Sequence, residues 1–413
     1  MITARFDLNM GGLDQVNPAD LWNDPKTLLM WIMHRAITER ASDIQIDKCG
    51  GQLRVRLCID GHLNTFLMGE DVTDRLGAVI KSAANMNIAE KRQPQDGRFS
   101  VQFFNRAVDF RVCALPTVEG YEDFALRLID DNVGLLSLDD LQLTPQQLQT
   151  LRQGITRSHG IILATGPTGC GKTTTLYAML QAINDGSKKI QTIEDPVELR
   201  IDGVSQAQVR GDIDLTFVNL LRSILRSTPD VIMVGEIRDL ETAKVAVSAA
   251  NTGHLVLSTV HTNDSLSAIN RLVEFGVPSY LVGQSLIMVM AQRLVRLLCS
   301  CSQEHPMQEE EKELFEKSGF RINSQHAPLI RSACGCVNCR NTGYKHRVVV
   351  MEIAKVTPGL RELVKRHADY LELLAEVRRH GFSTLYQECL LKVLRGLTAL
   401  AEIEKFQLAF NEF

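Results

Sequence analysis

The most restrictive feature of this sequence is a glycine-rich loop that stands between a short apolar run and a helical run. Residues 160–173 read GIILATGPTGCGKT, and the embedded GPTGCGKT fits the pattern G-x-x-x-x-G-K-[ST] without a mismatch. The pattern binds phosphate when a strand precedes it and a helix follows, and the helical run KTTTLYAMLQAI supplies that context. The sequence therefore predicts a strand, a phosphate loop and a helix that together bind a nucleoside triphosphate.

The residue types in this loop match that chemistry. Glycines let backbone N–H groups curl around phosphates, and the N-terminus of the next helix attracts anions. Lys172 supplies positive charge for the β- and γ-phosphates, and the hydroxyl of Thr173 can ligate Mg²⁺. We therefore expect ATP and Mg²⁺ as cofactors. The expected nucleotide-binding residues are Gly166, Pro167, Thr168, Gly169, Cys170, Gly171, Lys172, Thr173 and Thr174.

Composition narrows the class of protein. The chain has 413 residues, 45% of them hydrophobic and 23% charged, with a net charge of −4, so it has no global attraction to nucleic acid. Its N-terminus lacks the apolar core of a signal peptide. The most apolar stretch, 280–295, contains Gln284, Gln292 and Arg293 and is too short to span a bilayer. These observations predict a soluble, cytoplasmic protein in which 280–295 is core or a subunit interface.

The first third of the chain has the pattern of a small α+β domain. A leader over 1–30 precedes a helical run, and several short alternating segments follow it up to residue 130. Asp60-Gly61 between two of these segments is a hairpin signal. We expect an α+β domain over 31–130 and a linker over 131–142.

The next part alternates strands with helices, the pattern of a parallel, doubly wound α/β sheet. We expect this core over 143–295, a cysteine-rich subdomain over 296–345 and a helical region over 346–413. The expected strands of the core are 161–165, 190–194, 230–234 and 255–260.

Polar residues follow three of these strands. Glu194 ends one strand, Glu236 follows a second, and His261 follows a third. Parallel α/β sheets bind ligands at the carboxyl ends of their strands, so we expect these side chains near the phosphate loop. An ATPase needs acids for the metal shell and for the attacking water, and it can use a polar group that senses the γ-phosphate. Glu194, Glu236 and His261 are therefore candidate catalytic residues.

Four longer segments carry a family resemblance. GPTGCGKTTTLYAML, QTIEDPVEL, LLRSILRSTPDVIMVGEIRDLETA and TGHLVLSTVHTNDSLSAINRLVEFG resemble the signature boxes of the type II secretion and type IV pilus assembly ATPases. ASDIQIDKCGGQLRVRLCIDGHL and the tail GFSTLYQECLLKVLRGLTALAEIEKF extend the resemblance to residues 30–410. It implies a RecA-like ATPase core preceded by a PAS-like N-terminal domain. Many members carry a longer N-terminal extension that docks on a membrane partner, and we expect this chain to lack it.

The resemblance also implies a mechanism. Members form cytoplasmic rings, usually homohexamers, at the inner face of the membrane, where they act on a polytopic inner-membrane platform protein. Glu236 would position the attacking water and Glu194 would act on metal-bound water, with His261 in the histidine box. Arginines of the N-terminal domain would approach the γ-phosphate when the domains close. The matching residues are Arg98, Arg111 and Arg127.

Five of the ten cysteines lie within 299–339. Tetrahedral zinc sites often use two close pairs of thiolates, and Cys336 and Cys339 have the C-x-x-C spacing of such a pair and of the family's tetracysteine box. Cys299 and Cys301 form a C-x-C pair where the family usually has C-x-x-C. We expect structural Zn²⁺ bound by these four residues. Cys334 is then surplus, and His305 could also ligate the ion.

Three alternatives to an assembly or secretion motor remain at this stage. A pilus-retraction ATPase shares the core but usually lacks the cysteine box. A DNA-transfer or nucleic-acid translocase would be expected to carry basic and aromatic residues interleaved, which the sequence does not show. A nucleotide-gated scaffold would not need Glu194, Glu236 and Lys172 together. The sequence does not distinguish a pilus from a secretion system.

Overall fold

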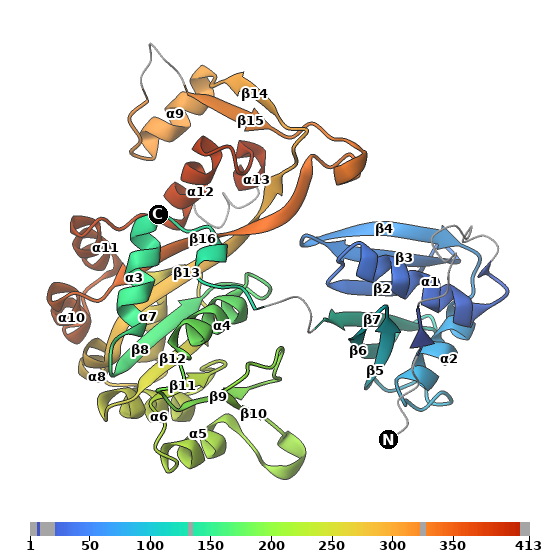
Figure 1. Cartoon of the computed structure of the whole chain (residues 1–413), viewed down its shortest axis with the longest axis horizontal. Coiled ribbons are helices and arrows are strands. Elements are labelled where there is room, and N and C mark those ends of the chain that lie inside the picture. Colours follow the sequence, from blue (N-terminus) through green and yellow to red (C-terminus); the bar gives the residue numbers. More distant parts are fainter. Residues whose placement is uncertain (1–5, 9–20, 131–134, 323–327, 405–413) are drawn as a thin grey trace. The chain divides into compact units, whose positions relative to one another are not determined.

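A computed structural model describes residues 6–8, 21–130, 135–322 and 328–404 of the chain. The chain divides into two compact units, Met1–Gly134 and Leu135–Phe413 (Figure 1). Most of the expected leader, and residues 131–134 of the expected linker, lie outside the described residues. The leader expected over 1–30 is shorter in the structure, because helix α1 already begins at Pro25. Strand β1, which also lies within the expected leader, pairs with β5 and belongs to the sheet.

The described residues of the first unit form a seven-stranded sheet with two helices. Its strands run in the order β1-β5-β6-β7-β2-β3-β4, and β1 pairs parallel with β5 while the other neighbours are antiparallel. The Asp60-Gly61 hairpin forms as predicted, with positive φ at both residues. The elements are β1 (Phe6–Asp7), α1 (Pro25–Thr38), β2 (Asp43–Cys49), β3 (Gln52–Ile59), β4 (His62–Gly69), α2 (Thr73–Ala83), β5 (Gln95–Phe103), β6 (Arg106–Pro116) and β7 (Glu122–Ile129).

The second unit is built on another seven-stranded sheet, with the strand order β10-β9-β11-β12-β8-β13-β16. Strand β8 is buried on both faces and reads as a continuous apolar run, as parallel central strands do. Its strands are β8 (Gly160–Thr165), β9 (Ile190–Glu194), β10 (Ser205–Gln208), β11 (Val231–Val234), β12 (Leu255–Val260), β13 (Leu286–Leu298) and β16 (Tyr344–Lys355).

Helices cover both faces of this sheet. One face packs against α3 and α4, and the other against α5 to α8, α10 and α11 (Figure 1). The predicted capping box at Thr144 and Gln147 starts α3. These helices are α3 (Pro145–Ile155), α4 (Lys172–Ile183), α5 (Phe217–Leu225), α6 (Leu240–Asn251), α7 (Ser265–Glu274), α8 (Ser279–Ser285), α10 (Pro358–Lys365) and α11 (Tyr370–Arg379).

The C-terminal part differs from the expectation. The sheet is mixed rather than wholly parallel, because β16 pairs antiparallel with β13. The region expected to be helical from residue 346 therefore contributes an edge strand of the second sheet. The apolar run VVVM of β16 is buried and packs into the core, so strand burial decides the conformation there. Most of the stretch 280–295 is buried in the core, although Tyr280 and Gln284 are exposed.

A smaller lobe lies beyond the ends of β13 and β16 (Figure 1). Its apolar residues pack in one cluster with the last helices and with residues of β13 and β16. The elements of the lobe are β14 (Gln303–Pro306), α9 (Glu309–Lys317) and β15 (Leu329–Ser332), and the last helices are α12 (Leu385–Leu394) and α13 (Leu400–Glu404).

Candidate functional site

The strand ends named from the sequence meet at one edge of the second sheet. Thr165, the last residue of β8, pairs with Val260 at the end of β12. The N–H of Gly235, which follows β11, donates to the carbonyl of Ile193 in β9 over 2.8 Å. The phosphate loop, Glu194, Glu236 and His261 therefore share the carboxyl edge, as the alternation of strands and helices predicted.

The glycines of the phosphate loop have conformations that other residues rarely adopt. Gly166, Gly169 and Gly171 have φ values of 141°, 77° and 88°. A Cβ at Gly166 would also lie only 2.6 Å from the carbonyl oxygen of Gln292. Both observations require glycine at this position. Helix α4 begins directly after Gly171, so its N-terminus points into the loop.

Lys172 is folded back over this loop. Its Nζ donates to the carbonyl oxygens of Gly166 and Pro167, over 2.7 and 3.0 Å. Partial burial of the ammonium group lowers the pKa of Lys172, and Cys170 and Glu236 partly oppose that effect. The hydroxyl-bearing Thr173 and Thr174 are exposed at the start of α4. The loop thus presents a positive charge, a helix N-terminus and free hydroxyls on one surface, which is a site suited to a polyphosphate.

Glu236 lies between two nitrogen-bearing side chains. Its Oε1 pairs with Arg238, and its Oε2 lies 3.5 Å from Nε2 of His261. Arg238 also lies 3.8 Å from Asp195. The Glu236 side chain is 15% exposed, so it can reach a water molecule at the sheet edge. The structure therefore brings together Glu236 and His261, and the charge of Glu236 also acts on Lys172.

Glu194 is in a different environment, because it is almost fully buried. Its carboxylate accepts hydrogen bonds from the hydroxyls of Tyr177 and Thr192 and from the amide of Gln206. Burial and the Glu194 charge both raise the pKa of Tyr177, so this hydroxyl stays a donor. Sequence patterns gave no signal for Tyr177 and Gln206, since neither belongs to a phosphate motif. Glu194 is thus held in one orientation by groups from α4, β9 and β10.

The three candidate arginines lie in the first unit, in one row across its sheet. Arg98 of β5 pairs in register with Arg111 of β6, which pairs with Arg127 of β7. Arg127 donates to Asp43 of the next strand over 2.9 Å. Like charges directly opposite one another destabilise a sheet, so an anion that binds this row would relieve repulsion. The structure thus gathers three residues that the sequence had named separately.

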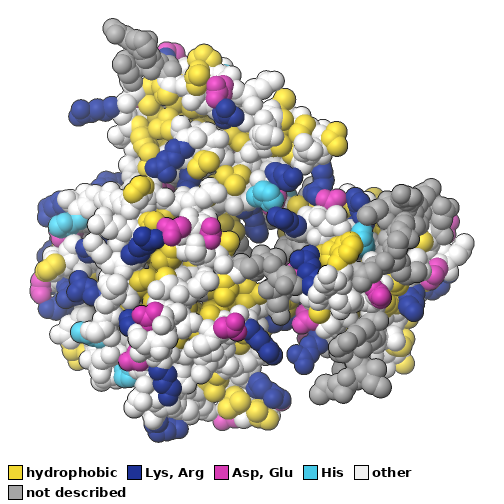
Figure 2. Space-filling model, viewed as in Figure 1, with side chains coloured by type: hydrophobic (Ala, Val, Ile, Leu, Met, Phe, Trp, Pro, Cys, Tyr) yellow, Lys and Arg dark blue, Asp and Glu magenta, His cyan; other side chains and the backbone are white. Residues whose placement is uncertain are grey.

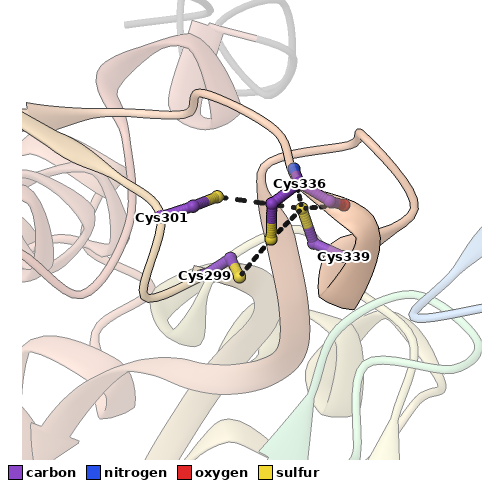
Figure 3. Close-up of side chains that lie close together, drawn as sticks. All are labelled: Cys299, Cys301, Cys336 and Cys339. Atoms are coloured by element: carbon purple, nitrogen blue, oxygen red, sulfur yellow. Dashed lines mark hydrogen bonds between the residues drawn. The ribbon is translucent and has the colours of Figure 1, made fainter.

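Four cysteines lie close together where the paired strands β13 and β16 meet the small lobe (Figure 3). The Sγ atoms of Cys299, Cys301, Cys336 and Cys339 all lie within 4.8 Å of one another. The Cys339 sulfur also accepts from the backbone N–H groups of Cys336 and Gly343, over 3.1 and 3.2 Å.

The donor set of this cluster is compatible with zinc, which prefers four thiolates in tetrahedral arrangement. The C-x-C pair fits because the N–H of Ser302 donates to the carbonyl of Cys299, a turn that brings Cys301 back to the cluster. Cys334 is exposed, and both His305 ring nitrogens contact other groups. Neither Cys334 nor His305 belongs to the group of possible ligands found among the described residues.

Among the residues that the structure describes, no helix is both long enough and apolar enough to cross a membrane. Basic and acidic side chains are intermixed over the face of the described residues drawn in Figure 2.

The fold and the site at its sheet edge define a P-loop nucleotide-binding protein. Residues 24–405 match the model of the family described as "Type II/IV secretion system protein", and the chain belongs to that family. It is a homologue of the type II secretion ATPases and of the type IV pilus assembly ATPases.

Individual relatives agree with this assignment. The chain is 43% identical to "Putative type II secretion system protein E" of Escherichia coli K12, over 91% of this chain and 75% of that protein. It is 41% identical to "Type IV pilus assembly ATPase PilB" of Acinetobacter baylyi, over 90% of this chain and 64% of that protein.

Among solved structures, the pilus retraction motor PilT with bound ADP is similar. It has a TM-score of 0.62 and 26% identity and covers 91% of this chain and 95% of its own. The Legionella pneumophila ATPase DotB has a TM-score of 0.69 at 21% identity, with 93% and 96% covered, which supports the fold alone.

Proposed function

We propose that this chain is a motor ATPase that powers type II protein secretion or type IV pilus assembly. It would couple ATP hydrolysis to interdomain motion that acts on an inner-membrane platform protein. The observation that carries the proposal is the sheet edge where Lys172, Glu236 and His261 lie together, in a chain 43% identical over 91% of its length to a type II secretion protein E. The motor would be a cytoplasmic homohexamer bound peripherally to the membrane through its partners.

Different residues of the sheet edge would carry out different parts of the reaction. Lys172 and the N-terminus of α4 would bind the β- and γ-phosphates. Thr173 would hold Mg²⁺, which would neutralise charge on the phosphate oxygens, and Glu194 would help to hold that ion through water. Glu236 would orient the attacking water, because its carboxylate is partly exposed and held beside His261. His261 would sense the γ-phosphate through Glu236.

Arg98, Arg111 and Arg127 supply the remaining cations. A row of guanidinium groups can stabilise the charge that develops on γ-phosphate oxygens in the transition state. The arginines and the phosphate loop belong to different units of the chain. Hydrolysis that uses both would therefore be coupled to motion between the units.

Zinc is proposed as a structural ion bound by Cys299, Cys301, Cys336 and Cys339. These thiols come from the two ends of the lobe, after β13 and before β16. An ion there would close the lobe that α9, β14 and β15 form, much as zinc closes other small modules that lack a large core.

Cellular and biochemical tests together would check this function. In the source organism, deletion of the coding sequence should abolish secretion or surface pili, and the wild-type chain but not Glu236→Gln should restore them. An increase in surface pili on deletion would instead indicate retraction.

Stimulation of the purified chain's ATPase by DNA, with salt-sensitive binding, would indicate a translocase. Absence of ATP turnover in the assembled ring would indicate a scaffold.

A further inference from the structure

Two polar residues interrupt the apolar strand β13 beside the phosphate loop. Gln292 is fully buried and Arg293 is 5% exposed. Strand β13 pairs with β8 only as far as Ala291 opposite Thr165, where β8 ends. Gln292 and Arg293 therefore continue alongside the phosphate loop rather than alongside a strand.

Gln292 supports the loop at two points. Its Nε2 donates to the carbonyl oxygen of Cys170 over 2.8 Å. Its own carbonyl oxygen occupies the space that a side chain at Gly166 would need. The Oε1 atom of Gln292 is buried and has no hydrogen-bond partner among the described residues. A buried acceptor without a partner is unfavourable, so packing alone does not explain a glutamine here.

Arg293 connects the same strand to the loop that follows β12. Its Nη2 donates to the carbonyl oxygen of Asn263, two residues beyond His261, and its Nη1 donates to the carbonyl oxygen of Gln292, both over 3.0 Å. Both acceptors are neutral, so no carboxylate among the described residues neutralises the guanidinium directly. The charged and titratable groups facing it are Cys170, Lys172, Asp264, Glu352 and Cys389. A buried positive charge thus lies directly behind the phosphate loop.

We propose that Gln292 and Arg293 are positioning residues for ATP hydrolysis. Gln292 holds the phosphate loop in place. Arg293 holds the loop that follows β12 and contains His261, so that the distance between the two loops is fixed. Strand β16 holds this part of β13 from the other side, through the pairs Gln292–Met351 and Arg293–Val350. The two loops therefore share one rigid support. The part that concerns His261 rests on the proposed function, and the part that concerns the phosphate loop does not.

Two conservative variants of the full-length chain test the proposal. Gln292→Met keeps the volume but removes both polar atoms, and Arg293→Lys keeps the charge but cannot donate to two carbonyls in a fork. Because small displacements of reacting groups cost large factors in rate, we expect kcat of each variant to fall about tenfold or more. The affinity for a fluorescent ATP analogue should stay within about threefold for Arg293→Lys, because the charge that attracts phosphate remains. Arg296→Lys, on the same strand but paired with Glu402, is the matched control and should keep wild-type turnover.

A double-variant cycle separates positioning from general destabilisation. If Arg293 acts through the His261 loop, Arg293→Lys should lower kcat in the wild-type background and have no further effect in a His261→Ala background. The proposal would be overturned if Arg293→Lys lowered kcat by the same factor in both backgrounds. It would also be overturned if Gln292→Met and Arg293→Lys both kept wild-type kcat. If His261→Ala itself keeps full turnover, the proposed role of His261 fails, while Gln292→Met still decides the phosphate-loop part.

Discussion

His261 and Glu236 face each other across the ends of two neighbouring strands, with Nε2 of the histidine 3.5 Å from Oε2 of the glutamate. Arg238 approaches the other carboxylate oxygen. The glutamate is therefore oriented from two sides while its side chain keeps some contact with solvent. An ionised carboxylate in this position can accept a hydrogen bond from a water molecule and aim it at a phosphate in the adjacent loop.

Replacement of Glu236 should separate hydrolysis from binding. We expect Glu236→Gln to lower kcat by about a hundredfold or more, because the amide cannot orient or accept from water as a carboxylate does. ATP affinity should stay near that of the wild type, since Lys172 and the loop carry binding. Steady-state hydrolysis and equilibrium binding of a fluorescent ATP analogue check both statements. Loss of ATP binding in Glu236→Gln would refute this role.

The hydrogen bond from Tyr177 to Glu194 gives a second prediction. Tyr177→Phe removes one hydroxyl from a buried cage and leaves the packing of the ring unchanged, so we expect kcat to fall about tenfold through reorientation of the carboxylate. In a Glu194→Gln background, which should itself have lost turnover, the same change should have no additional effect. Tyr280→Phe, at an exposed position on α8, is the control. Full activity of Glu194→Gln would show that this carboxylate is not catalytic.

The arginine row gives a third prediction. Alanine at Arg98, Arg111 or Arg127 should lower kcat by about a hundredfold or more with little change in ADP affinity, because the row acts on charge that develops only in the transition state. Arg106 lies on the same strand as Arg111 but outside the row, so Arg106→Ala is the control and should retain activity. If all three row variants hydrolyse ATP at the wild-type rate, the row has another purpose.

Metal content tests the cysteine cluster. Protein purified without added zinc should contain about one equivalent per chain, because four thiolates within tetrahedral reach form a closed structural site. Cys339→Ser should lose most of this metal, and Cys334→Ser should keep it, since Cys334 lies outside the cluster. Elemental analysis and the thermal unfolding midpoint are the two readouts. Far less than one equivalent in the wild-type chain would exclude the site.

Glu352 gives a prediction about pH. Its carboxylate accepts from the N–H and hydroxyl of Ser265 and from the N–H of Leu385, and complete burial raises its pKa to about 7. Between its ordinary pKa and this value the folded chain holds a proton that the unfolded chain has released. This contribution to stability is therefore present at acidic pH and is lost as pH rises through about 7, a change of about 3 kcal/mol in total.

Chemical unfolding at several pH values checks this statement. Glu352→Gln cannot ionise, so the fall in its free energy of unfolding between about pH 4.5 and about pH 7 should be shallower than in the wild type. The variant will also be less stable overall, because its amide nitrogen cannot accept a hydrogen bond. The slope is therefore the decisive quantity. Parallel curves for the two proteins would contradict the pKa shift.

The sequence predicted the positions of residues at the sheet edge more completely than the architecture around them. Glu194, Glu236 and His261 could be placed at that edge because each lies at the end of an apolar run that is recognisable without tertiary information. Gln292 and Arg293 could not, since they merely appeared as polar interruptions of an apolar stretch. The strand β16 was missed because it pairs with β13, from which the small lobe separates it in sequence.

Local patterns determined the phosphate loop, the alternation of strands and helices, and the two cysteine pairs, because each depends on residues within a few positions of one another. Tertiary structure alone decided that Glu194 is enclosed by Tyr177 and Gln206 while Glu236 is left partly open. It also decided that three arginines stand in register and that β13 supports two loops at once. These relationships arise from strand pairing and burial between distant segments, and short-range patterns carry no information about such pairing.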